Sequence, residues 1–267
     1  MNNRSFRVGT LPVVCIGLVI LAYLAYAIVL PTPTKPDATW TRIKETGVLR
    51  IGIDPSFPPF AVDDGKGNLS GYDIALAQAL AQRWGVRIQY VYTGFDGLYD
   101  ALTGNQFDMI LSALPYNPTK TQDVYFTHDY FNGGPVIVVA ATDQSTRSLY
   151  DLTGRSVAVE LGTGGDIFAR RWQRRLDLNL REMNTTTEAL EAVQRGQVGA
   201  AIVDPISFYD FDRAHPSAGR TVGGPLARES YAMAVRRDSP TLLRELNDAL
   251  DAMIRDGSLQ ELQKKWF

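Results

Sequence analysis

Short apolar strands alternate with amphipathic helices along most of this 267-residue chain. Val48–Ile53 predicts a strand, and Tyr72–Trp84 predicts a helix whose apolar residues recur on one face until Gly85 ends it. The strands predicted over 86–92 and 107–112 enclose a short helix over 95–102. This rhythm predicts parallel sheets that are covered by helices and bind ligands near the carboxyl ends of their strands.

The alternation begins again after an apolar run from Pro135 to Ala141. Strands are predicted over 157–161, 200–203 and 231–235, and helices over 162–175, 185–195, 205–213 and from 240 onward. Two α/β units of similar size, followed by a C-terminal segment that returns to the first, predict two lobes joined by two crossing strands.

The N-terminus carries the signature of an exported protein. Arg4 and Arg7 precede an apolar run, residues 11–30, and a Pro-rich linker is predicted over 31–40. Residues 1–30 are either a signal peptide cleaved after Ala27 or a retained membrane anchor, since about 20 apolar residues span a bilayer. The apolar run continues past Ala27, which favours the anchor. Either alternative places the rest of the chain outside the cytoplasm.

Composition argues against several classes of function. The net charge is −2 and no segment is dominated by Lys or Arg, so no nucleic-acid partner is expected. One cysteine, Cys15, allows neither an internal disulfide nor a multi-cysteine metal site. His128 and His215 are the only histidines, and no nucleophile–base pair is visible. We therefore expect no metal, no cofactor and no enzymatic activity.

Nine short motifs between about Thr41 and Phe267 follow one another in a recognisable order. They are LRIGIDPSFPPF (49–60), GYDIALA (71–77), FDGLYDAL (95–102), QFDMI (106–110), YFT (125–127), LTGRSV (152–157), LGTG (161–164), AIVD (201–204) and KWF (265–267). Together they resemble family 3 of the bacterial extracellular solute-binding proteins, which includes the amino-acid-binding components of ABC importers.

The resemblance implies a two-lobed, periplasmic-binding-protein-like (type II) α/β fold that closes around a solute. Lobe 1 would hold residues 41–134 and 232–267, and lobe 2 would hold residues 135–231.

The resemblance assigns two positions in lobe 2 to the charged ends of an amino acid. Asp204 would accept from the α-ammonium group, although Asp before Pro205 also suits the N-cap of a helix. Thr163 and Gly164 lie in a glycine-rich turn that would bind the α-carboxylate with backbone N–H groups at a helix N-terminus. Without the resemblance, this turn could equally be a plain tight turn.

The lobe 1 half of the carboxylate site departs from the family pattern, S-G-x-T-x-T-x-x-R. Ser112 is present, but Pro115 stands in place of a hydroxyl residue and has no N–H. Lys120 stands in place of arginine, which exchanges a bidentate fork for a point charge. We expect the carboxylate to bind through Lys120, Ser112 and the lobe 2 turn, and the changes put the ligand class in question.

Three further positions match residues that line the solute in relatives. Phe57 would be a stacking platform, Phe95 an opposing wall and Asp54 a carboxylate, while ordinary core packing is the alternative for each ring. Asp54 and Asp204 together suit a solute with cationic character.

The expected function is extracytoplasmic capture of a small polar solute, an amino acid or related amine or carboxylate, for the membrane subunits of an ABC transporter. We expect a monomer, held at the membrane only if residues 11–30 are retained. Two alternatives remain open. One is a sensor that reports solute to a membrane receptor, and the other is a periplasmic enzyme resembling cyclohexadienyl dehydratase, with Asp54, Asp204 or Glu229 as acid or base.

Overall fold

A computed structural model describes residues 37–267, which form one compact unit containing two large sheets with their hydrophobic cores and one small sheet. The predicted signal peptide or anchor, residues 1–30, lies outside the described residues. Within residues 37–267, no helix is both long and apolar enough to cross a membrane.

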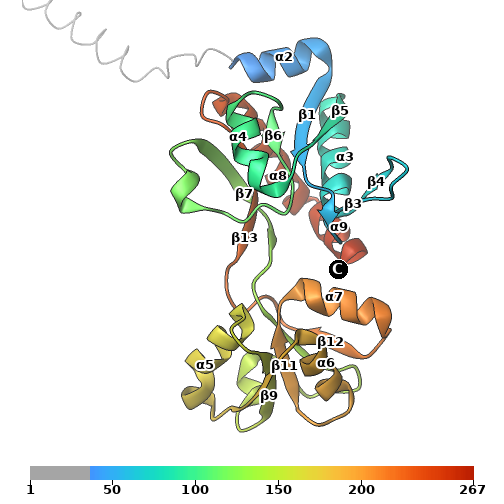
Figure 1. Cartoon of the computed structure of the whole chain (residues 1–267), viewed down its shortest axis with the longest axis vertical. Coiled ribbons are helices and arrows are strands. Elements are labelled where there is room, and N and C mark those ends of the chain that lie inside the picture. The colour runs from blue at the N-terminus through green and yellow to red at the C-terminus, as the bar shows by residue number, and fades with distance from the viewer. Residues whose placement is uncertain (1–36) are drawn as a thin grey trace, which may run out of the picture. The chain divides into compact units, whose positions relative to one another are not determined.

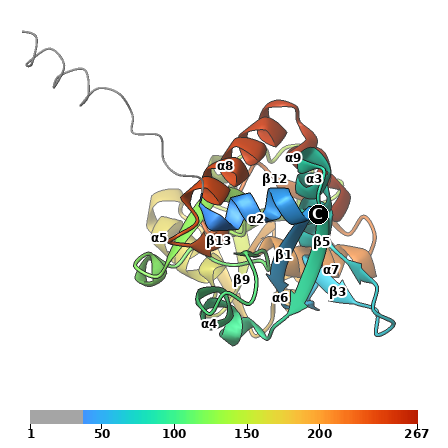
Figure 2. The same cartoon turned by 90° about the horizontal axis from the view of Figure 1, so that it is seen from above.

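The linker prediction is wrong for residues 38–40, because helix α2 (Ala38–Thr46) begins there. The Asp37 side chain caps this helix by accepting from the Trp40 N–H, and it also accepts from the Thr241 N–H at 2.6 Å. Asp37 thus fixes α2 to the start of helix α8 (Pro240–Arg255), and Figure 2 shows the two helices next to each other.

The first sheet has the strand order β5-β1-β6-β13-β7. Its strands are β1 (Val48–Ile53), β5 (Arg87–Tyr92), β6 (Met109–Ile110), β7 (Val124–Asn132) and β13 (Ser230–Arg236). Strand β1 pairs in parallel with β5 and β6, whereas β13 runs antiparallel to β6 and β7. Helix α3 (Tyr72–Trp84), α8 and α9 (Ser258–Trp266) pack on one face, and α4 (Leu98–Thr103) packs on the other.

The second sheet has the order β10-β9-β11-β8-β12. Its strands are β8 (Val136–Ala140), β9 (Ser156–Glu160), β10 (Asn179–Met183), β11 (Ala200–Val203) and β12 (Gly219–Val222). Strand β9 is parallel to β10 and β11, and β8 is antiparallel to β11 and β12. Helix α5 (Gly164–Leu176) covers one face, while α6 (Thr186–Gln194) and α7 (Pro205–Ala214) cover the other.

Two neighbouring segments connect the sheets, one from β7 to β8 and one from β12 to β13 (Figure 1). They are hydrogen-bonded to each other, with the Gly133 N–H donating to the Glu229 carbonyl at 2.8 Å and the Leu226 N–H to the Pro135 carbonyl at 2.8 Å. A Cβ at Gly134 would collide with the Ala227 carbonyl, so glycine permits this close approach. These features confirm the predicted two-lobed α/β fold with two crossing strands.

A small antiparallel sheet follows β1 and projects from the first lobe. It consists of β2 (Ser56–Phe57), β3 (Ala61–Asp63) and β4 (Leu69–Ser70), and the predicted hairpin loop 64–68 joins the last two. The Asp64 side chain accepts from the backbone N–H groups of Lys66 and Asn68, which closes the loop. This sheet places Phe57 beside the carboxyl end of β1.

Candidate functional site

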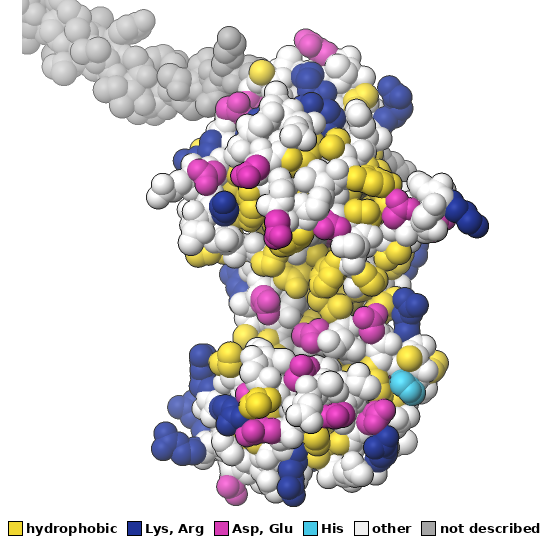
Figure 3. Space-filling view, in the orientation of Figure 1, with side chains coloured by type: hydrophobic (Ala, Val, Ile, Leu, Met, Phe, Trp, Pro, Cys, Tyr) yellow, Lys and Arg dark blue, Asp and Glu magenta, His cyan; other side chains and the backbone are white. Residues whose placement is uncertain are grey.

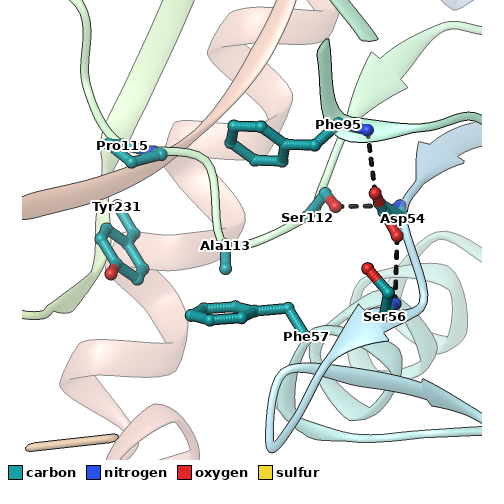
Figure 4. A pocket seen from close by; sticks show the side chains of 8 residues that line it. All are labelled: Asp54, Ser56, Phe57, Phe95, Ser112, Ala113, Pro115 and Tyr231. Atoms are coloured by element: carbon teal, nitrogen blue, oxygen red, sulfur yellow. Dashed lines mark hydrogen bonds between the residues drawn. The ribbon is translucent and has the colours of Figure 1, made fainter. Parts of the chain in front are cut away.

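A cavity of about 290 Å³ lies where strands β1, β5 and β6 end. Asp54 follows β1, Phe95 follows β5 and Ser112 follows β6, as expected for a ligand site at the carboxyl edge of a parallel sheet. The volume is close to the lower limit for small-molecule pockets, roughly 300 Å³. The eight lining residues, shown in Figure 4, are Asp54, Ser56, Phe57, Phe95, Ser112, Ala113, Pro115 and Tyr231.

Two aromatic rings form walls of the cavity. Phe57 is 43% exposed and Phe95 is 44% exposed, so both offer apolar surface that the core does not use. Phe57 stacks on the buried Phe60 with ring centroids 5.7 Å apart, and this contact fixes the orientation of the Phe57 ring. Figure 3 shows hydrophobic side chains gathered on this face of the molecule, at the level where the sheets are connected. An exposed aromatic patch of this kind is typical of a ligand-binding surface.

Asp54 joins the ends of three strands through hydrogen bonds. Its carboxylate accepts from the Ser56 N–H at 3.1 Å and from the Phe95 N–H at 2.8 Å, and its own N–H donates to the Ser112 hydroxyl at 3.0 Å. These bonds orient the carboxylate at one end of the cavity (Figure 4) and position the Phe95 ring. Each oxygen retains a second lone pair for a solute.

A buried carboxylate holds the turn that carries Ser112. The Ala113 N–H donates to the Asp73 side chain at 2.6 Å, and Ala113 has a φ of +44°, which non-glycine residues rarely adopt. Asp73 is fully buried, and this burial raises its pKa to about 7, with the Ala113 N–H acting in the opposite direction. The sequence did not reveal Asp73 as part of the site, because Asp73 lies in a motif whose pattern predicts only helix α3.

Pro115 and Tyr231 close the cavity on the side of the crossing strand. Pro115 forms an isolated β-bridge with Tyr231, flanked by hydrogen bonds from the Tyr116 N–H to the Ser230 carbonyl at 2.8 Å and from the Ala232 N–H to the Leu114 carbonyl at 3.0 Å. Pro115 itself contributes no donor. Tyr231 was not predicted as a site residue. It lies on β13, which joins the site only after the chain has passed through lobe 2.

The structure brings four of the eight predicted site residues together: Asp54, Phe57, Phe95 and Ser112. Lys120 lies outside the lining of this cavity, and its Nζ sits 5.1 Å from the centroid of the Tyr99 ring.

The three lobe 2 residues also lie outside the lining. Asp204 caps α7 by accepting from the Ser207 N–H at 2.8 Å, so the capping alternative is realised. Thr163 caps α5, which begins at Gly164. The Gly162 N–H in this turn already donates to the protein's own Asp166 carboxylate at 3.0 Å, which leaves fewer free donors for an anion.

Fold and cavity together define a two-lobed solute-binding protein of the type II periplasmic class. The profile of the bacterial extracellular solute-binding proteins, family 3, matches residues 49–267. The chain belongs to this family, as its motifs predicted.

Individual relatives agree with this classification. A probable amino-acid ABC transporter-binding protein of Haemophilus influenzae is 26% identical over 249 residues, covering 92% of this chain and 95% of the relative. A solved structure of an ancestral cationic amino acid solute-binding protein is 31% identical with a TM-score of 0.63, covering 86% of this chain and 100% of that chain.

One solved neighbour is named as an enzyme. An ancestral cyclohexadienyl dehydratase has a TM-score of 0.77 at 24% identity, covering 87% of this chain and 97% of that chain. At this identity the likeness concerns the fold alone. The Haemophilus influenzae relative, an L-cystine-binding relative and an L-arginine-binding relative match 82–93% of this chain and are named as binding proteins.

Proposed function

We propose that this protein captures a cationic amino acid outside the cytoplasm and delivers it to the membrane subunits of an ABC importer. The observation that carries the proposal is the composition of the cavity: two exposed aromatic rings, a pre-oriented Asp54 carboxylate, and no Lys or Arg among its lining residues. Such a site attracts a cation and repels an acidic side chain.

The rings and the carboxylate act on the same part of a solute. A guanidinium or ammonium group between Phe57 and Phe95 gains about 0.5–2 kcal/mol from each cation–π contact, more when water is excluded. A charge-assisted hydrogen bond to Asp54 adds directionality. A neutral aliphatic side chain would use the rings but leave the Asp54 carboxylate facing apolar atoms.

The α-ammonium and α-carboxylate need partners of their own, because burying either group unpaired is costly. We assign the ammonium to Asp204, and the carboxylate to Lys120, Ser112 and the turn at Thr163 and Gly164. Asp204, Thr163 and Gly164 do not line the lobe 1 cavity, so their roles depend on hinge closure of lobe 2. Lys120 belongs to lobe 1, and its side chain must turn from the Tyr99 ring towards the cavity.

The comparisons support this choice of solute. The chain is 31% identical to a structure named as a cationic amino acid solute-binding protein, along the whole of that protein. Family membership supports delivery to an importer. We further propose that the protein works as a monomer and that residues 11–30 hold it at the membrane.

Thermal unfolding of residues 31–267 in the presence of single solutes tests the proposal. L-Arginine, L-lysine, L-ornithine or L-histidine at about 100 times the dissociation constant is expected to add about 2.7 kcal/mol of stability. The variant Asp204→Ala is expected to lose this shift. It should keep its fold apart from the missing helix cap, which costs about 1 kcal/mol. A shift with L-glutamate or sugars, and none with cationic amino acids, would refute the proposed solute class.

A further inference from the structure

Tyr231 presents an unused polar group at the end of the cavity opposite Asp54 (Figure 4). The residue as a whole is only 7% exposed. Among the hydrogen bonds within residues 37–267, none involves the Tyr231 hydroxyl, whereas the neighbouring Tyr72 hydroxyl donates to the Tyr130 carbonyl at 2.9 Å. The Tyr231 hydroxyl oxygen is not among the buried polar atoms without a partner, so it remains accessible although most of the residue is buried. An accessible hydroxyl without a protein partner, on a residue that lines a cavity, is free to bind a ligand.

The ring that carries this hydroxyl is held firmly. It packs against Phe60 and Phe131, with centroid distances of 5.5 and 5.7 Å. On the other crossing segment, a Cβ at Gly133 would lie 3.0–3.2 Å from Tyr231 side-chain atoms, so glycine leaves the space that the hydroxyl end occupies. The Pro115 bridge fixes the backbone on the third side. A group fixed in this way loses little freedom when it binds a solute.

The charges around Tyr231 favour a cation. Burial raises the pKa of Tyr231 to about 12, and the carboxylates of Glu229, Asp204 and Asp73 add to this effect. The hydroxyl is therefore protonated at neutral pH and lies in a negative field. A neutral hydroxyl keeps two acceptor lone pairs, which an ammonium group can use.

We propose that the Tyr231 hydroxyl accepts a hydrogen bond from the solute's α-ammonium group and thereby selects solutes that carry an amine at this end of the cavity. The inference rests on the proposed function and refines it. Asp54 and the two phenylalanine rings receive the cationic side chain, while Tyr231 and Asp204 receive the α-ammonium. Tyr231 is thus a specificity residue located on the crossing strand itself.

Calorimetric titration of residues 31–267 and its Tyr231→Phe variant tests the proposal. The probes are L-arginine, agmatine, which keeps the amine but lacks the carboxylate, and 5-guanidinopentanoate, which lacks the amine. The variant should bind L-arginine and agmatine about 10- to 100-fold more weakly, the range for one hydrogen bond to a charged group. Its affinity for 5-guanidinopentanoate should equal that of the native protein.

Tyr116→Phe is the matched control, because Tyr116 is 49% exposed, adjoins Pro115 and does not line the cavity. It should leave all three affinities unchanged. An equal loss for the amine and the amine-free probe in Tyr231→Phe, or no loss at all, would overturn the role of the hydroxyl. Failure of the native protein to bind L-arginine, agmatine, L-lysine or L-histidine would instead overturn the proposed function, and with it this inference.

Discussion

Replacing Asp73 with asparagine is expected to remove a pH dependence of stability that this one carboxyl group creates. Asp73 is fully buried in lobe 1 and accepts from the Ala113 N–H at 2.6 Å. An asparagine side chain has the same shape and can accept the same hydrogen bond. The substitution therefore removes the charge while keeping the turn that carries Ser112.

The magnitude follows from the shift in pKa. Burial raises the pKa of Asp73 from 3.8 to about 7, so the folded state favours the protonated form. The stability gained from this preference is complete below pH 3.8 and is lost as the pH rises through 7. At about 1.4 kcal/mol per pKa unit, the free energy of unfolding should fall by about 3 kcal/mol between pH 4.5 and 7.5.

Other groups near Asp73 do not titrate in this window. Burial raises the pKa values of Tyr90 and Tyr231 to about 12, and it also raises those of Tyr72 and Tyr130, so all four rings stay neutral. The carboxyl groups with lowered pKa values, such as Asp64 and Asp151, lose their contribution only as the pH falls below their ordinary value of 3.8.

Urea unfolding of residues 31–267 at pH 4.5, 6.0 and 7.5 measures the effect. The native protein should lose stability with rising pH, and Asp73→Asn should lose about 3 kcal/mol less over the same range. Asp123→Asn, which changes an exposed carboxylate, is the control and should follow the native protein. Parallel curves for the native protein and Asp73→Asn would refute the reasoning.

Three further substitutions test other contacts. Asp108 is fully buried and accepts from Arg42 at 2.5 Å, from the Arg50 guanidinium at 2.7 Å and from the Arg50 N–H at 2.8 Å. Asp108→Asn should therefore lower the urea-derived stability by about 3 kcal/mol. Asp238→Asn removes an exposed carboxylate that pairs with Arg236, and it should cost less than about 1 kcal/mol. Equal losses would contradict the burial argument. Lys120→Arg should tighten calorimetric binding of ordinary amino acids by restoring a bidentate fork, whereas an unchanged or weaker affinity would mean that the site suits another anion geometry.

Sequence periodicity located the inner strands of the two large sheets and one edge strand, β5, but not their other three edges. Strands β7, β10 and β12 were not predicted, and each lies at an edge of its sheet. Central strands are covered on both faces and read as apolar runs, such as Ala200–Val203. Edge strands meet solvent, so β10 carries Asn, Arg and Glu between its apolar residues and offers no comparable signal.

The candidate site was predictable where one local motif placed several residues at the end of one strand. Asp54 and Phe57 belong to the motif that follows β1, and both line the cavity. Tyr231 lies on a strand whose sequence reads simply as buried apolar structure, and its position beside Pro115 arises only from sheet pairing. A residue that enters a site through long-range pairing leaves no local pattern, and the unpartnered hydroxyl becomes visible only in three dimensions.

The structural and binding interpretations of the two predicted acidic site residues are compatible. Asp54 accepts from two backbone N–H groups and Asp204 caps α7, so each carboxylate is oriented before any solute arrives. A carboxylate that is already immobilised loses no rotamer freedom on binding and still has lone pairs to share. The capping role of Asp204 therefore favours its proposed binding role, because a helix cap supplies the rigidity that selective recognition of an ammonium group requires.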